Sequence, residues 1–235
     1  MSNSETSKTL LILETVGLTA LAFIVSLLLG VFFIVILIVM GYKADSTFAL
    51  SGSSIIGQIG FLLIAFFYIR RRDVEVPFKI PSKSNLKYIV GGIVITLVTA
   101  ISLLQIQSML DLMSESVLQE IVEGNPIILI ILAIISIVLV APSEELLFRG
   151  AIQGRLRERF GPYPSIITSS LLFGSLHLLN FTGEILPTIF SALIIVVIGG
   201  ILGWLYERST NIIVPIFIHG IYNFILFVVS YFALM

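Results

Sequence analysis

Long apolar runs, separated by short polar segments, are the dominant pattern along this chain. A helix that spans a bilayer needs about 20 mainly apolar residues, and most of these runs approach or exceed that length. In order, the runs predict spanning helices at residues 16–40, 54–70, 88–104, 126–148, 163–180, 186–206 and 211–233. We therefore expect an all-α, polytopic membrane helix bundle of about seven transmembrane helices, with eight as the alternative count. The first run begins at Leu10 and is too long for a cleaved signal peptide, so we interpret it as an uncleaved anchor.

Composition agrees with a membrane protein and removes several classes of function. Hydrophobic residues make up 57% of the 235 residues and charged residues 11%, and the mean hydropathy is +1.12. Such values are typical of membrane chains. A net charge of −1 argues against a nucleic-acid partner. The chain has no cysteine, which excludes disulfides, zinc–thiolate sites and a thiol nucleophile.

Basic residues are distributed unequally between alternate loops, and this predicts the orientation. With the amino terminus in the cytoplasm, twelve of the thirteen basic residues fall in cytoplasmic segments, and the outer segments hold only Lys43. The twelve are Lys8, Arg70, Arg71, Arg72, Lys79, Lys83, Lys87, Arg149, Arg155, Arg157, Arg159 and Arg208. By the positive-inside rule we expect a multi-pass protein of the cell membrane, with a cytoplasmic amino terminus and an external carboxyl terminus. The basic loop 70–87 would then lie near anionic membrane lipid.

The segment 105–125 differs from the apolar runs on either side of it. Apolar residues such as Ile106, Met109, Leu110 and Met113 recur at helical intervals. This spacing predicts an amphipathic helix on the outer surface of the membrane, with a solvated loop as the alternative.

Charged residues interrupt the apolar pattern most sharply in the segment Ala141–Gly150. It contains Glu144, Glu145 and Arg149, and it follows the uncharged stretch from Pro126 to Val140. Each ionisable residue at the centre of a bilayer costs roughly 2.5–3.5 kcal/mol on insertion scales. Such residues usually face a protein interior or a water-filled cavity and have a function.

Helical spacing separates the two carboxylates. Glu145 and Arg149 lie four residues apart on one helix face and can form an ion pair, whereas Glu144 is rotated by about 100° and stays available. The only two histidines, His177 and His219, lie in later helices. Counted at 1.5 Å per residue from the predicted cytoplasmic ends, Glu144, His177 and His219 lie at depths of roughly 16, 21 and 12 Å. We therefore expect a shared cavity that opens to the cytoplasm.

A carboxylate beside a neutral imidazole can take a proton from water and produce a nucleophile at neutral pH. A second histidine, with Asn223 one turn after His219, can donate hydrogen bonds to the oxygen of an attacked carbonyl. These groups suit the hydrolysis of a peptide bond. The same residues fit a second interpretation, in which two histidines and one glutamate hold a divalent metal such as zinc. The structural alternatives are juxtamembrane charge for the glutamates and helix-packing contacts for the histidines.

Three motifs of this chain, taken together, resemble those of a known protease family. They are Glu144-Glu145-x-x-x-Arg149, Phe173-x-x-x-His177 and His219-x-x-x-Asn223. In order and placement they resemble the CAAX protease and bacteriocin-processing family (CPBP, also called Abi) of intramembrane endopeptidases. The resemblance covers about Pro126 to Val228. It divides the chain into amino-terminal helices at residues 1–125 and a CPBP-like catalytic core at residues 126–235.

The resemblance implies a cavity reached from the cytoplasm and from the bilayer, and a role for each residue. It makes Glu144 the base that activates water with the help of His177, and it makes His219 and Asn223 the groups that stabilise the oxyanion. Glu145 and its arginine partner would order the site. The substrate would be a membrane-associated peptide or protein, cleaved in the manner of CAAX-type endopeptidases or of enzymes that process bacteriocins and other peptides.

Two other functions fit an apolar bundle of this size. A non-catalytic membrane scaffold or bacteriocin-immunity protein would retain the fold and bind a peptide, but it would not need an intact Glu144, His177 and His219. A transporter is disfavoured because the chain shows no inverted repeat and no paired broken helices. We therefore expect an intramembrane endopeptidase, with the scaffold as the alternative.

Overall fold

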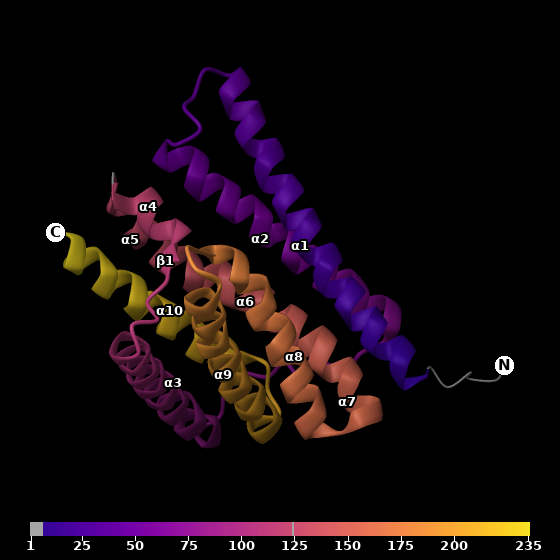
Figure 1. Ribbon diagram of the computed structural model, residues 1–235. Coiled ribbons are helices and arrows are strands. Elements are labelled where there is room, and N and C mark those ends of the chain that lie inside the picture. Colours follow the sequence, from indigo (N-terminus) through magenta and orange to yellow (C-terminus); the bar gives the residue numbers. More distant parts are fainter. Residues whose placement is uncertain (1–6, 124) are drawn as a thin grey trace.

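Helices make up nearly all of the described part of the chain, which comprises residues 7–123 and 125–235 of a computed structural model (Figure 1). The longer ones are α1 (Lys8–Val39), α2 (Thr47–Arg72), α3 (Lys83–Met109), α8 (Pro162–His177), α9 (Ile185–Ser209) and α10 (Ile213–Leu234). A further long rod consists of α5 (Ile127–Ile135), the π-helical segment η1 (Ser136–Val140), α6 (Ala141–Glu145), the π-helical segment η2 (Leu146–Gln153) and α7 (Gly154–Phe160). The short elements are β1 (Glu115–Ser116), α4 (Val117–Glu123), the 3₁₀ turn η3 (Leu178–Asn180) and β2 (Phe181–Thr182). The predicted all-α bundle is confirmed.

Six helical stretches in the described residues are long and apolar enough to cross a membrane. They are α1, α2, α3, the rod from α5 to α7, α9 and α10. The remaining predicted helix, the fifth, at residues 163–180, is present as α8, but it has only 16 residues. This is shorter than the roughly 20 residues of a full span. The chain is thus a multi-pass membrane protein with a short helix where the sequence predicted the fifth of seven spans.

Serine side chains begin the first three helices. Ser7, Ser46 and Ser82 each accept a hydrogen bond from the backbone N–H three residues later, which satisfies one of the N–H groups that a helix start leaves free. At the other end of α2, Asp73 adopts the left-handed conformation with a φ of 52°, and the chain turns there into the segment 74–82.

Glu14 is the charged residue inside the first apolar run, and α2 provides the partners that its charge needs. Its Oε1 lies 2.6 Å from Arg72 Nε and accepts a 3.1 Å hydrogen bond from the Tyr68 hydroxyl. Charge-assisted contacts of this kind are among the stronger polar interactions in proteins. They help to hold α1 and α2 together as a hairpin.

The segment 105–125 does not form one amphipathic helix. Its first part completes α3, the chain turns at Asp111 with a φ of 56°, and β1 and α4 follow. β1 pairs antiparallel with β2, with Glu115 opposite Thr182. The buried Gln107 amide donates to the Leu112 backbone oxygen and to the Ser191 hydroxyl. These contacts stabilise the turn and join the end of α3 to α9.

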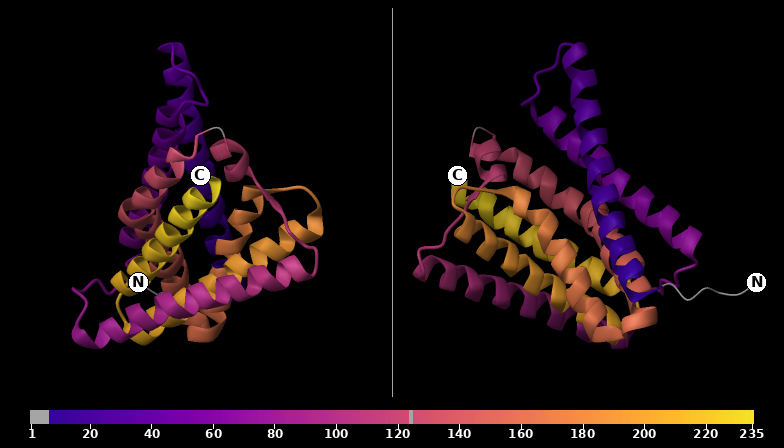
Figure 2. Two further views of the ribbon diagram at one scale, coloured as in Figure 1. Left: turned by 90° about the vertical axis from the view of Figure 1, so that its left-hand side faces the viewer. Right: turned by 45° about the vertical axis from the view of Figure 1, so that its right-hand side comes forward.

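The basic segments of the chain gather at one end of the bundle (Figure 2). The ammonium group of Lys8 lies 5.6 Å from the centre of the Phe160 ring at the end of α7. The segment 74–82 lies against the start of α10, where Ile212 N–H donates to the Pro77 oxygen over 2.8 Å. The carboxyl terminus and α4 lie at the opposite end. This grouping agrees with the alternation of loops that the sequence predicts, while the cytoplasmic assignment of the basic end stays a prediction.

Apolar side chains also cover the outside of the bundle. On α1, Leu13, Leu28 and Phe32 are more than half exposed. Large exposed apolar areas are unusual on soluble monomers. An outer surface of this kind is suited to contact with lipid chains.

Candidate active site

The charged motif lies in a rod whose helical winding changes on both sides of it. α6 carries Pro142, Glu144 and Glu145, and η1 and η2 flank it. Pro142 has no N–H to donate, and its ring crowds the carbonyl four residues earlier in a regular α-helix. A wider π-helical turn before the proline relieves this conflict. Such turns are frequent at functional sites, and here they lie directly beside the two glutamates.

Glu145 is fully buried and contacts two other predicted site residues. Its Oε1 lies 3.1 Å from Arg149 Nη1 and 2.8 Å from His219 Nδ1. The ion pair with Arg149 is the one that the four-residue spacing predicts. The contact with His219 joins α6 to α10 across 74 positions of sequence. Glu145 therefore holds a cation and an imidazole in place and has little freedom to act as a base.

Arg149 balances the buried charge of Glu145 and joins the motif to two neighbouring helices. Only 1% of its surface is exposed. Its Nη2 donates a 2.9 Å hydrogen bond to the backbone oxygen of Gly199 on α9, and its guanidinium carbon lies 4.9 Å from the centre of the Phe173 ring on α8. A buried ion pair needs good geometry and additional hydrogen bonds to offset the loss of water. Arg149 has the hydrogen bond to Gly199 and a cation–π interaction, whereas its Nη1 lies close to Glu145 without a hydrogen bond in the described residues.

Glu144 points in a different direction and makes no ion pair with an arginine or lysine among the described residues. Its side chain is 12% exposed, and its Oε2 lies 3.8 Å from His219 Nε2. That distance is longer than a hydrogen bond. Its Oε1 accepts a 3.3 Å hydrogen bond from Gln58 Nε2 on α2. One glutamate is thus neutralised by an arginine and the other keeps a carboxylate oxygen free, as the helical geometry of adjacent residues predicts.

His219 lies between the two glutamates, with Nδ1 toward Glu145 and Nε2 toward Glu144. An ionised carboxylate only accepts hydrogen bonds, so the ring donates Nδ1–H to Glu145. This contact fixes the orientation of the ring and assigns one of its protons. The Nε2 edge is then the part of the ring that faces Glu144 and any group bound beside it.

His177 ends α8 and is held by its own helix. Its Nδ1–H donates a 2.9 Å hydrogen bond to the backbone oxygen of Phe173, one helical turn earlier. In the neutral ring, Nε2 then carries the lone pair. No hydrogen bond or ion pair joins His177 to Glu144 in the described residues.

The Phe173 ring packs against the rings of both histidines. The centre of its ring lies 4.7 Å from that of His177 and 5.8 Å from that of His219, the latter at an interplanar angle of 89°. It also packs edge-on against Phe148, at 5.0 Å. The sequence identifies Phe173 only as a motif position. The structure shows it packed against three of the predicted site residues: His177, His219 and Arg149.

Asn223 lies one turn beyond His219 on α10 and is half-buried. Its amide makes no hydrogen bond to the part of the chain that the structure describes. The structure therefore brings Glu144, Glu145, Arg149 and His219 into direct contact. It brings His177 in through Phe173, and it leaves the Asn223 amide with its donors unused.

Two polar residues at the site were not predicted from the sequence. Gln58 donates to Glu144, and Ser143 donates to the Gln58 side-chain oxygen. Gln58 lies 86 positions before Glu144 and belongs to no motif. The only available signal was an amide inside a predicted span, where polar side chains usually have a partner.

The metal hypothesis requires two histidines and one glutamate that surround a single ion. Among the described residues, no three His, Asp or Glu side chains form a group that could hold a metal. Each histidine uses its Nδ1 for another contact, His219 for Glu145 and His177 for the Phe173 backbone oxygen, and each keeps its Nε2 free of hydrogen bonds within the described residues. The described side chains do not gather three ligands around one point, and dependence on a metal stays a prediction.

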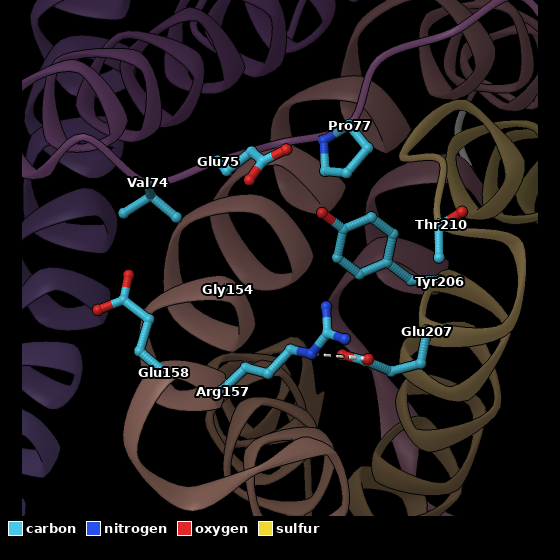
Figure 3. A pocket seen from close by; sticks show the side chains of 9 residues that line it. All are labelled: Val74, Glu75, Pro77, Gly154, Arg157, Glu158, Tyr206, Glu207 and Thr210. Atoms are coloured by element: carbon cyan, nitrogen blue, oxygen red, sulfur yellow. Dashed lines mark ion pairs between the residues drawn. The ribbon is translucent and has the colours of Figure 1, made fainter.

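A cavity of about 370 Å³ lies at the basic end of the bundle (Figure 3). Its lining comes from the segment 74–82, from α7 and from the end of α9. Within it, Arg157 Nε lies 3.1 Å from Glu207 Oε2. Glu144 and the two histidines do not line this cavity. The cytoplasm-facing cavity that the sequence predicts around them stays a prediction.

Comparison with known protein families matches residues 126–225 to the family described as Rce1-like, "Type II CAAX prenyl endopeptidase Rce1-like". This interval includes all three motifs, from Glu144 to Asn223. No curated protein and no solved structure matches the chain. The resemblance drawn from the motifs is confirmed by this match: the segment that holds the candidate site, residues 126–225, is similar to the Rce1-like CAAX protease family.

Proposed function

We propose that this chain is an intramembrane endopeptidase that hydrolyses peptide bonds of membrane-associated peptides or proteins. The family match supports a protease of the CAAX type at the level of the family. The proposal rests mainly on one observation: the two adjacent carboxylates have different contacts. Glu145 is occupied by Arg149 and His219, whereas Glu144 keeps one oxygen free of hydrogen bonds.

Glu144 is the base in this proposal. Its carboxylate takes a proton from a water molecule while the water oxygen attacks the carbonyl carbon of the scissile bond. When the carbon–nitrogen bond breaks, the same proton passes to the leaving nitrogen. One water is consumed, and the products are a new carboxylic acid and a new amine, which ionise to a carboxylate and an ammonium group when the second water proton passes to the amine. His177 assists by accepting a hydrogen bond from the water at Nε2, the nitrogen left unprotonated when Nδ1–H donates to Phe173.

His219 and Asn223 stabilise the negative oxygen that forms on the attacked carbonyl. Because His219 Nδ1–H already donates to Glu145, Nε2 can donate to the oxyanion only when the ring carries both protons. Glu144 and Glu145 together carry one negative charge more than Arg149 balances, and this is the counter-charge that such a ring needs. The Asn223 amide has donors unused in the described residues and lies one turn further along the same helix. Donors placed in advance around a developing charge are among the largest contributions to catalysis.

The substrate reaches this site from the membrane in our proposal, and the site opens toward the cytoplasm. The gathering of basic segments at one end of the bundle and the apolar outer faces of the helices support this orientation. Both CAAX-type substrates and other membrane peptides satisfy these constraints.

The test compares peptides in membranes that carry the wild-type protein, Glu144→Gln or Glu115→Gln. Glu115 is an exposed carboxylate in β1, so its variant is a matched control for the loss of one negative charge. We expect the same shortened peptides from wild type and Glu115→Gln, and their absence with Glu144→Gln. Identical profiles for all three proteins would contradict the protease and favour the non-catalytic scaffold.

A further inference from the structure

Gln58 uses both ends of its side-chain amide at the candidate site. Its Nε2 donates to Glu144 Oε1 over 3.3 Å, and its Oε1 accepts from the hydroxyl of Ser143 over 2.5 Å. Gln58 lies on α2, whereas both partners lie on α6. The residue is therefore a bridge from the amino-terminal helices, outside the family match at 126–225, to the proposed base.

The chemistry of the partners fixes the orientation of this amide. Ser143 is fully buried, and its hydroxyl has two acceptors in reach, the Gln58 side-chain oxygen and, at 2.9 Å, the Val140 backbone oxygen. The amide oxygen must face that hydroxyl, because the reverse orientation would place the oxygen against the Glu144 carboxylate. Two acceptors in contact would be unfavourable in a buried setting. The Glu144 carboxylate thus determines that the amide N–H faces it, and the Ser143 hydroxyl is placed to donate to the amide oxygen at the other end.

The two oxygens of Glu144 therefore have different surroundings. Oε1 is held by Gln58, and Oε2 faces His219 at a distance too long for a hydrogen bond. A base must be held in position while one oxygen stays free to receive the proton. The bond from Gln58 meets the first requirement, and the open Oε2 meets the second.

A second cavity, of about 390 Å³, shows what Gln58 separates from the site. It lies where the α1–α2 hairpin diverges from α4 and α5 (Figure 1). Most of its lining is apolar, with residues such as Val31, Ile128 and Leu132, and Gln58 is part of that lining. The Gln58 side chain is thus between this apolar cavity and Glu144. Without its amide, Oε1 would lose its one hydrogen-bond donor in the described residues, on the side that faces this mostly apolar lining.

We propose that Gln58, held at its amide oxygen by Ser143, is a positioning residue that holds Glu144 in the geometry of a base. The inference rests on the proposed function, since it assigns Glu144 the role of base. It adds a residue of the amino-terminal helices to a site whose motifs all lie in the carboxyl-terminal half.

The test measures kcat and KM for cleavage of a lipid-anchored peptide by the purified full chain in vesicles. Gln58→Met keeps the length of the side chain but removes both polar atoms. We expect kcat to fall about 10–100-fold, the range typical for loss of a group that orients an active-site ligand, with KM changed by less than about 3-fold because ground-state binding does not use the bond. Ser54→Ala, a change in the same cavity lining, should leave both constants unchanged.

Ser143→Ala tests the bridge itself. If Ser143 acts through Gln58, Ser143→Ala lowers kcat, and the double variant with Gln58→Met is no slower than Gln58→Met alone. If the fold-losses in kcat of the two single variants multiply in the double variant, the two residues act independently, and this would contradict an action of Ser143 through Gln58. A wild-type kcat for Gln58→Met, in a preparation where Glu144→Gln is inactive, would overturn the inference and leave the proposed function intact.

A melting experiment keeps the inference testable if the wild type cleaves no peptide, which would contradict the proposed function. Gln58→Met should shift the melting temperature less in a Glu144→Ala background than in the wild type, because the bond is already absent there. Equal shifts in the two backgrounds would overturn the contact between Gln58 and Glu144.

Discussion

Glu145 and Glu144 are neighbours in the chain with opposite requirements. Glu145 is buried beside Arg149 and His219, and its second oxygen, Oε2, has no hydrogen-bond partner in the described residues. Burial of charge is costly unless the charge is paired, so the loss of either partner is expected to destabilise the fold. Glu144 is partly exposed, so its carboxylate loses less contact with water on folding. Stability should therefore depend on Glu145, and activity on both residues.

This difference predicts opposite results for two alanine variants. Glu145→Ala leaves Arg149 as a buried charge without its partner, which costs about 3–5 kcal/mol. We expect a low folded yield and a lower melting temperature, whereas Glu144→Ala should fold normally and lack activity. Glu158→Ala is the control, because Glu158 pairs with Arg155 at the surface, where an ion pair contributes at most about 1 kcal/mol. Normal yield for Glu145→Ala with misfolding of Glu144→Ala would reverse the two roles.

Asn223 offers a second prediction at this scale. Its amide donates to nothing in the described chain, so Asn223→Ala should barely change stability. If the amide stabilises the oxyanion, kcat should fall by roughly 10²–10³-fold with a smaller change in KM. Ser230→Ala, on the exposed face of the same helix, provides the comparison. An increase in KM at constant kcat would show that Asn223 binds the substrate and does not act on the transition state.

The site residues differ in how far the sequence could identify them. Spacing along one helix predicts the Glu145–Arg149 pair and the separate direction of Glu144, because both depend only on helix geometry. The His219–Glu145 contact depends on how α10 packs against α6. The Gln58–Ser143 bridge depends on the packing of α2, 85 positions away in sequence. The spacing of residues within one helix holds no information on contacts between residues so far apart in the sequence.

At the scale of the elements, α9 approaches the site through two glycines. Gly199 and Gly203 have the small-xxx-small spacing that allows close helix packing. Their backbone oxygens accept hydrogen bonds from Arg149 and Gln153, respectively. A Cβ on Gly199 would meet Phe173 Cδ1 at 3.1 Å and Arg149 Nη2 at 3.4 Å. Close approach is therefore needed both for packing and for the hydrogen bond that orients Arg149.

The adjacent glycine provides a matched test of this packing. Gly199→Ala should lower the melting temperature, by the equivalent of about 1–3 kcal/mol for an overpacked site, and should reduce activity by displacing Arg149 or Phe173. Gly200→Ala places its Cβ 3.9 Å from Ser170 Oγ, an ordinary contact. Alanine favours helix over glycine by about 1 kcal/mol, so this variant should be neutral or stabilising. Equal losses of stability in the two variants would contradict the role of Gly199.

Two elements show the limits of hydrophobic pattern. The apolar run of the predicted fifth span continues through Leu178 and Leu179, but α8 ends at His177 because the chain turns there toward β2. The segment 105–125 has helical spacing, yet β1 interrupts it to pair with that same β2. Both departures lie beside the β1–β2 pairing, a contact between segments far apart in sequence. The periodicity of apolar residues identified the long helices, but it could not identify the pairing of β1 with β2.

At the scale of the whole molecule, the account depends on which end faces the cytoplasm. The basic segments gather at one end, although Arg149 is buried at the site and does not contribute to that surface. Single cysteines at Lys83 and Glu115, introduced into this cysteine-free chain, lie exposed on opposite sides of the predicted membrane. We expect an impermeant thiol reagent added outside intact cells to label Glu115→Cys and to spare Lys83→Cys. Labelling of both from outside would refute the orientation.

The central claim is that Glu144 drives peptide hydrolysis, and cleavage by purified protein tests it most directly. Wild type and Glu144→Gln are placed in vesicles with a lipid-anchored peptide and a metal chelator, and mass spectrometry identifies the products. The account predicts a new carboxyl terminus with the wild type, undiminished by the chelator, and none with Glu144→Gln. Equal cleavage by Glu144→Gln would contradict the role of Glu144. Loss of wild-type cleavage in chelator, with recovery on addition of zinc, would contradict a mechanism in which the carboxylate activates water without a metal.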